Sequence, residues 1–144
     1  MVSRLWFIDT GHENCMEVEG YDCIRPDQIE WFLNESKAIP DGHPGKNNGI
    51  AFIHIPLPEY LTMRNDCKTF GHQWDHVGCS SINSGFFTAV KHAGSVKAIT
   101  CGHDHNNDFV GDYEGVKLLY GRKTGYGSYG PKFMMRGARV FELE

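Results

Sequence analysis

Three histidines follow two apolar, strand-like stretches of the chain and could bind metal ions. His54 comes directly after residues 51–53, and His103 and His105 lie just past residues 98–101. Loops at the carboxyl ends of strands are where α/β folds bind ligands. In extended backbone two residues spaced as H-x-H face the same side. They could therefore serve one ion, or two ions about 3.5–4 Å apart, and imidazole suits zinc, iron and similar metals.

Polar neighbours of this H-x-H pair could support such a site. Asp104, Asn106 and Asp108 occupy the same loop and could orient a ligating ring through its second nitrogen. Gly102, without a Cβ, is expected to let the chain turn sharply before His103. An H-x-H pair is also compatible with solvated or backbone-bonded histidines, and it is His54 at a second strand end that favours metal.

A glycine-rich segment near the C-terminus offers groups for an anion. Tyr126 and the loop of residues 121–125 could approach a phosphate, because Arg and Lys suit that ligand. A plain connection between strands with solvated charges explains the same residues equally well. The other five histidines are expected to be loop or surface groups, although His72 and His76 lie in a long loop and could approach the site: His12, His43, His72, His76 and His92.

Apolar periodicity and breaker residues predict the elements that carry these residues. They predict helices from Pro26 to about residue 37 and from residues 83–84 to Gly94. Residues 10–24 read as irregular, and residues 57–83 as a long connection with no clear period. Strands are predicted at residues 4–9, 50–55, 96–101, 108–113, 115–121 and 132–143, with Gly111 and Gly115 in hairpin turns. This order implies an α/β layered fold with a mixed sheet.

Composition narrows the class of protein. The chain has 144 residues, enough for one domain or part of one. A net charge of −4 gives no basic field, so nucleic acid is not expected as the main partner. No apolar run reaches the roughly 20 residues of a membrane-spanning helix, and no signal peptide is visible. The five cysteines form no C-x-x-C pair and are expected to be reduced, which slightly favours an intracellular location.

The histidine motifs resemble those of a known superfamily. The stretch Gly102-His103-Asp104-His105, preceded by VKAITC, resembles the last metal motif of calcineurin-like metallophosphoesterases. The segment FIHIPLPEY resembles that superfamily's isolated metal-binding histidine. The likeness is closest to the purple-acid-phosphatase-like, Dcr2-type branch. Five more stretches resemble that branch in the same order: LWFIDTG, GYDCIRPDQIEWF, INSGFF, LLYGRKTGYGSYG and GARVFEL.

The resemblance implies a four-layer αββα sandwich with a dinuclear metal centre at its strand ends. Such proteins hydrolyse phosphate esters with two ions of Fe, Mn or Zn. Carried over by motif, His54 and His103 would bind one ion and His105 the other. Because the chain lacks the carboxylates of a dinuclear centre, a single zinc ion held by the three histidines and one water is an alternative.

The resemblance covers only the C-terminal half of that domain. The motifs D-x-H, G-D-x-x-D and G-N-H-[DE] of the first half are absent, and with them the histidine that protonates the leaving group. Three partial matches, at residues 11–13, 41–43 and 111–115, are incomplete or lie in the wrong place. Residues 1–144 are therefore expected to be one partial domain whose partner is the missing half, in the same longer chain or a separate one.

Two functions follow from this reading. The chain is expected to belong to a phosphate-ester hydrolase and to be inactive alone. The alternative is a non-catalytic metal-binding or interaction module derived from the same fold. Half a sandwich is also expected to expose an apolar sheet face and to associate.

Overall fold

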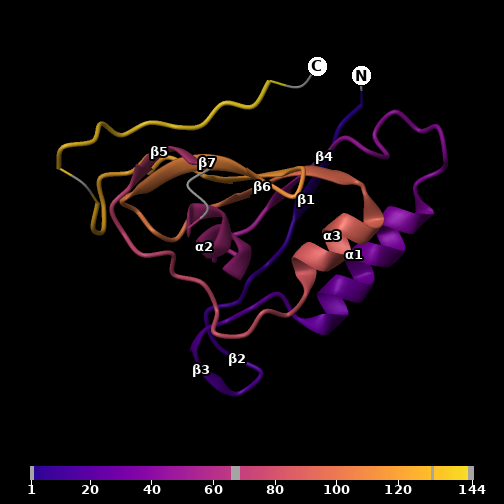
Figure 1. The fold of residues 1–144 in the computed structure, drawn as a ribbon, viewed down its shortest axis with the longest axis horizontal. Coiled ribbons are helices and arrows are strands. Elements are labelled where there is room, and N and C mark those ends of the chain that lie inside the picture. Colours follow the sequence, from indigo (N-terminus) through magenta and orange to yellow (C-terminus); the bar gives the residue numbers. More distant parts are fainter. Residues whose placement is uncertain (1, 66–68, 131, 143–144) are drawn as a thin grey trace.

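In the part of the chain that the structure describes, six strands form one mixed sheet, and three helices cover one of its faces (Figure 1). The computed structural model describes residues 2–65, 69–130 and 132–142. The strand order is β1-β4-β6-β8-β7-β5. Strands β1, β4, β6 and β8 run parallel, whereas β7 and β5 are each antiparallel to their neighbours. Their bounds are β1 Arg4–Phe7, β4 Gly49–Phe52, β5 Thr69–Gln73, β6 Val96–Cys101, β7 Asn107–Tyr113 and β8 Val116–Tyr120. The predicted α/β class with a mixed sheet is confirmed.

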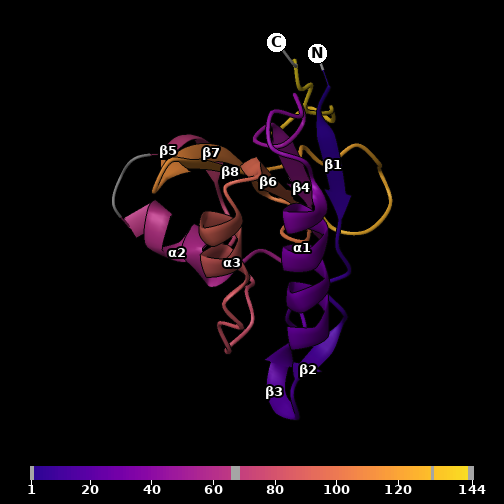
Figure 2. The same cartoon turned by 90° about the vertical axis from the view of Figure 1, so that its right-hand side faces the viewer.

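The helices begin and end where local sequence signals favour it. Helix α1 (Pro26–Ala38) starts with a proline, whose missing N–H would have had no partner in the first turn. Helix α3 (Phe86–Ala93) ends at Gly94, which has a φ of 66°. Helix α2 (Pro58–Asn65) follows β4 after a short connection. All three lie on the same side of the sheet (Figure 2).

The core lies between the sheet and these helices. One row of side chains crosses four neighbouring strands in register and is almost completely buried: Trp6, Ala51, Ile99 and Leu118. Phe32 of α1, Tyr60 of α2 and Phe86 of α3 pack onto this face and are also fully buried. Because β4 and β6 are neighbours with helices packed beneath them, the ends of both strands are rigidly placed. Those ends carry the histidines.

Several local predictions are wrong. The stretch predicted as a connection, residues 57–83, contains α2 and β5. The strand predicted at residues 132–143 is absent over residues 132–142, the part of it that the structure describes. Gly111 lies inside β7, and only Gly115, with a φ of 78°, lies in the predicted hairpin turn. A five-residue strand with mostly exposed side chains and a short helix carry little periodicity, so apolar patterning indicated neither β5 nor α2.

Residues 10–24, predicted as irregular, form a hairpin closed by a disulfide. Strands β2 (Glu13–Cys15) and β3 (Val18–Tyr21) pair through a tight turn in which Met16 and Glu17 both have positive φ. A disulfide joins Cys15 to Cys23. The expectation of reduced thiols is therefore wrong for these two residues, and it no longer favours any compartment. We call residues 13–23 the disulfide hairpin.

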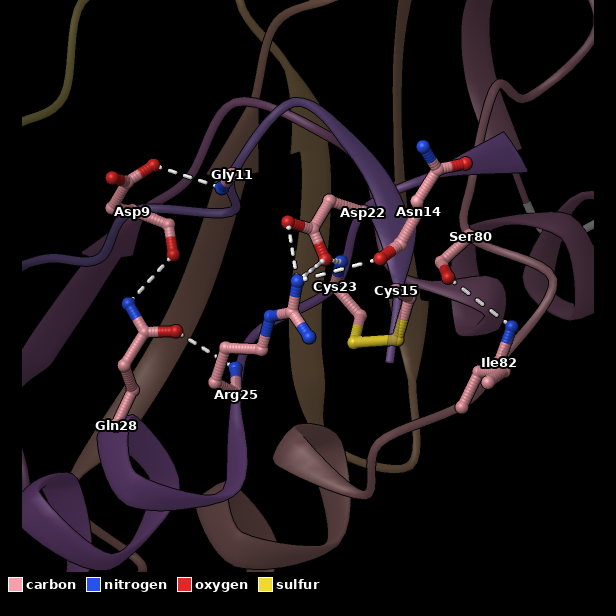
Figure 3. A network of polar contacts seen from close by, with 10 residues as sticks. All are labelled: Asp9, Gly11, Asn14, Cys15, Asp22, Cys23, Arg25, Gln28, Ser80 and Ile82. Carbon is pink, nitrogen blue, oxygen red and sulfur yellow. Dashed lines mark hydrogen bonds and ion pairs between the residues drawn. A yellow bond between two sulfur atoms is a disulfide. The ribbon is translucent and has the colours of Figure 1, made fainter. Parts of the chain in front are cut away.

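Polar contacts join the disulfide hairpin to the start of α1 (Figure 3). The guanidinium group of Arg25 lies 2.9 Å from the carboxylate of Asp22 and donates to the backbone carbonyl of Asn14. The Gln28 side chain accepts from the Arg25 N–H and donates to the carbonyl of Asp9. The hairpin is thus tied to the helix by directional bonds as well as by its own covalent closure.

The sheet face opposite the helices is only partly covered. The C-terminal segment, residues 132–142, runs across this side (Figure 1), where Phe141 packs against Phe52 with ring centroids 5.9 Å apart. Leu5 and Phe7 of β1 remain 49% and 70% exposed on it.

Two further cysteines, the half-buried Cys79 and the buried Cys101, are free thiols, and Cys67 lies outside the described residues. In the described part of the chain, no helix is both long and apolar enough to cross a bilayer.

Candidate metal centre

His54 and His103 meet at the carboxyl ends of β4 and β6. The two strands are parallel neighbours, so the residues that follow them emerge at one edge of the sheet. The Gly102 N–H donates to the His54 carbonyl at 3.1 Å, which continues the strand pairing to the site. The two imidazole rings lie edge to face, with centroids 5.2 Å apart. The rigid sheet therefore holds one histidine against the other.

The spacing of the two rings suits a shared ion. Nε2 of His54 and Nδ1 of His103 lie 3.4 Å apart. Two nitrogen ligands about 2.0–2.1 Å from a tetrahedral zinc ion lie about 3.3–3.4 Å from each other. The ring nitrogens that face each other are therefore placed as ligands of one ion would be.

His105 lies on the far side of the turn and has different partners. Among the described residues, the three histidines do not form a set with ring nitrogens within 4.8 Å of one another. A single zinc ion held by all three is therefore not offered by this arrangement. The ring of His105 is instead stacked on Tyr129, with centroids 4.2 Å apart and an angle of 16° between planes.

Residues 102–105, which we call the histidine turn, depart from extended backbone. His103 has a φ of 71°, a left-handed conformation that costs a side-chain-bearing residue of the order of 1 kcal/mol or more. Gly102 does not have positive φ, so the expected sharp turn falls one residue later. A Cβ at Gly102 would lie 3.5 Å from Nδ1 of His54, an ordinary van der Waals distance, so the neighbouring ring does not require glycine at this position.

Asp104 holds the histidine turn in place through hydrogen bonds of its buried side chain. Its side chain points inward, is 8% exposed, and accepts from the hydroxyl of Tyr120 at 2.6 Å and the N–H of Gly78 at 3.0 Å. Gly78 approaches so closely that a Cβ would lie 2.7 Å from Asp104 and 3.0 Å from His103. In this geometry Asp104 fixes the backbone between the two rings, and the expectation that it orients a ligating ring stays a prediction.

The surroundings favour a neutral imidazole at His103. Burial lowers its pKa, and the neighbouring His54 and His105 lower it further, while Asp104 acts in the opposite direction. A metal ligand must be deprotonated, so a lowered pKa is the direction that suits metal binding.

The other polar candidates also make contacts away from the rings. Asn106 donates to Asp75 through both its backbone and its side chain. Asp108 forms ion pairs with Arg122 and Arg139, which tie the loop after β8 and the C-terminal segment to β7. Tyr126 is 86% exposed and lies under the guanidinium group of Arg136. None of these contacts involves His54, His103 or His105.

Carboxylates are scarce at this site. Of the acidic residues expected beside it, Asp104 is engaged in the interior and Asp108 is paired with two arginines. One group of three possible metal ligands is found in the described part of the chain: Cys15, Asp22 and Cys23. Its two sulfurs form the disulfide, so they are not available to an ion.

Three tyrosines that the sequence did not single out surround the histidine turn. Tyr120 of β8 supports Asp104, Tyr21 of the disulfide hairpin contacts the ring of His103 edge to face, and Tyr129 stacks on His105. The tyrosine chosen from sequence, Tyr126, is three residues from the one that reaches the site. The one sequence signal that leads to Tyr129 is the expectation that the glycine-rich segment around it approaches the site.

Comparison with known proteins gives consistent matches, although no protein-family model matches the chain. Over 99% of its length the chain is 40% identical to a protein of Arabidopsis thaliana named probable inactive purple acid phosphatase 29, of which the match covers 39%. It is 34% identical to probable inactive purple acid phosphatase 28 of the same plant, covering 36% of that protein. Phosphatase DCR2 of Saccharomyces cerevisiae is 30% identical over 75% of the chain and 20% of its own length. The chain spans less than two fifths of the length of these relatives.

Proposed function

Since the chain belongs to the purple-acid-phosphatase-like branch of the calcineurin-like metallophosphoesterases and corresponds to the C-terminal half of that domain, we propose that it supplies part of the dinuclear metal centre of a phosphoesterase. The observation that supports this is the 3.4 Å separation of His54 Nε2 and His103 Nδ1 at the ends of adjacent parallel strands. These two residues would hold one ion and His105 the other, with Fe, Mn or Zn as the metals.

The residues present fit one half of such a centre. Two divalent ions polarise a phosphate ester and make bound water acidic enough to attack it. His54, His103 and His105 contribute imidazole nitrogens but no negative charge to offset the ions. The ligating carboxylates and the histidine that protonates the leaving group belong to motifs that this chain lacks. Residues 1–144 therefore act as one partial domain, and hydrolysis needs the other half.

The open sheet face is the surface that this other half would cover. Leu5 and Phe7 are exposed on it, and β1 is an edge strand of the sheet among the described residues. An edge strand with an apolar neighbourhood invites pairing.

We expect the 144-residue chain to associate, as measured by size-exclusion chromatography with light scattering. Phe7→Lys should reduce the association and Leu61→Lys, at an exposed position of α2, should not. A monodisperse wild-type monomer would contradict the proposal that this face is a surface for association.

Metal binding tests the site directly. In calorimetric titrations with Zn²⁺ or Mn²⁺, His54→Ala and His103→Ala should each weaken binding by at least about tenfold. His92→Ala, at the end of α3, is the matched control and should bind as the wild type does. Equal affinity in all four proteins would overturn the assignment.

Activity separates the two functions that remain. The isolated chain should show little turnover of p-nitrophenyl phosphate with Mn, Fe or Zn. When joined to an upstream segment that carries the three missing motifs, it should become active, and His103→Ala should abolish that activity. The alternative is a non-catalytic metal-binding or interaction module, which the word "inactive" in the names of the plant relatives favours. A joined protein that binds metal without turnover would support this alternative.

A further inference from the structure

Tyr129 connects the two histidines of the histidine turn through one side chain. It lies in residues 121–130, which we call the tyrosine loop, after β8. Its hydroxyl accepts from the backbone N–H of His105 at 3.0 Å and donates to the carbonyl of His103 at 3.3 Å. Its ring is stacked on that of His105. Both the backbone and the ring of His105 are therefore held by the same residue.

The backbone of Tyr129 also decides which nitrogen of His105 carries the proton. Nδ1 of His105 lies 2.8 Å from the carbonyl oxygen of Tyr129. A carbonyl only accepts hydrogen bonds, so Nδ1 must be the protonated nitrogen. Lys123 Nζ lies farther from the same nitrogen, at 3.3 Å, and donates to the carbonyl of Gly127 at 2.7 Å, so the shorter contact with the Tyr129 carbonyl sets the tautomer. In the neutral ring, Nε2 is then left with its lone pair.

We propose that Tyr129 is a positioning residue that fixes the Nδ1–H tautomer and the ring plane of His105, so that Nε2 is the nitrogen presented to a ligand. A backbone carbonyl on the second nitrogen is a common way to orient a ligating histidine. The tautomer follows from the geometry alone, whereas the identity of the ligand as a metal ion rests on the proposed function.

The tautomer can be tested without metal or activity. Long-range ¹H–¹⁵N NMR of the metal-free chain, at a pH where histidines are neutral, should show His105 protonated at Nδ1. Tyr129→Ala keeps the backbone carbonyl but removes the stacked ring and the hydroxyl that hold this carbonyl against His105. The variant should therefore lose the fixed state and give the mixture, mainly Nε2–H, of a free imidazole. Tyr126→Ala is the matched control, since that side chain is exposed, and should leave His105 unchanged. Protonation at Nε2 in the wild type, or an unchanged tautomer in Tyr129→Ala, would overturn the proposal.

A conservative variant separates positioning from folding. Tyr129→Phe keeps the ring and the backbone carbonyl but removes the hydroxyl, so the tautomer should persist while the His105 amide exchanges faster with solvent. An unprotected His105 amide in the wild type would argue against the hydroxyl contact. Circular dichroism should be the same in wild type and Tyr129→Phe.

Metal titration then links the positioning to the site. Tyr129→Ala should weaken Zn²⁺ binding by about tenfold, as losses of an orienting partner commonly do. Equal Zn²⁺ affinity in wild type and Tyr129→Ala would overturn the positioning role. If the wild type shows the Nδ1–H tautomer but binds no Zn²⁺ or Mn²⁺, the proposed function fails at this chain while the tautomer assignment stands.

Discussion

The histidine turn is held on its two sides by segments built in opposite ways. On one side, Tyr21 belongs to the disulfide hairpin, which is closed covalently and tied to α1 through Asp22 and Arg25. Its contact with His103 is edge to face, with centroids 4.4 Å apart. On the other side, Tyr129 belongs to the tyrosine loop, which contains no disulfide and holds His105 by hydrogen bonds and a stacked ring.

The comparison shows that a rigid segment does not by itself orient a histidine ring, whereas directional hydrogen bonds do. The disulfide hairpin is firmly closed but offers His103 only a ring edge, which tolerates small shifts of the ring. The tyrosine loop is held by weaker bonds, yet its contacts specify both a ring plane and a tautomer. Covalent closure stabilises a segment mainly by restricting the unfolded chain, whereas a hydrogen bond specifies where a proton lies. Breaking each side should therefore have different consequences.

The largest expected effect comes from opening the disulfide hairpin. Replacing both Cys15 and Cys23 with Ser should lower the free energy of unfolding by about 2–3 kcal/mol, the loop-closure value for a bridge across a short loop. Urea denaturation followed by tryptophan fluorescence measures this loss. Cys79→Ser, at a half-buried free thiol, is the control and should cost less.

The same double variant tests whether the two sides are independent. NMR contacts between Tyr21 and His103 should weaken, while those between Tyr129 and His105 should remain. The loss of both sets would show that the disulfide hairpin supports the whole histidine turn, and the comparison would then fail.

A smaller effect is expected from the support that both sides share. Tyr120→Phe removes the buried hydrogen bond to Asp104 and should cost about 1–2 kcal/mol. Burial, together with nearby Cys101 and Asp104, raises the pKa of Tyr120. A raised pKa means that this contribution is complete below the unfolded pKa of about 10, declines above it as the unfolded tyrosine ionises, and is lost once the pH passes the folded value. The stability difference between wild type and Tyr120→Phe should therefore be constant from pH 7 to 9 and shrink above pH 10. A difference that grows with pH would contradict this assignment.

Local sequence patterns predicted the elements that place the site. Strand β6 matches its predicted bounds of residues 96–101, and α3 ends at the predicted Gly94, because apolar runs and glycine caps are local signals. Placing His54 and His103 at strand ends was enough to expect them at one edge of the sheet. The structure brings their rings together, and the metal itself stays a prediction.

Local sequence patterns did not predict the contacts between segments that are distant in the sequence. The strands of the disulfide hairpin are only three and four residues long and mostly exposed, so they show no apolar alternation. An odd number of cysteines gave no pairing. Tyr129 reaches His105 across 24 residues of sequence, through a loop without regular structure. Its choice over Tyr126 depends on the path of that loop, which composition does not determine.

The smallest effect expected is that of the ring contact made by Tyr21. Tyr21→Ala should cost about 0.5–1 kcal/mol, the usual value of an aromatic pair at a partly exposed position. Tyr21→Phe should be neutral, because phenylalanine reproduces an edge-to-face contact. The pair contrasts with the changes at Tyr129, where the hydroxyl alone is expected to matter for the protection of His105. If Tyr21→Phe instead loosens His103 in amide exchange as Tyr129→Phe loosens His105, then the disulfide hairpin also acts through a directional bond, and the two sides of the site are alike.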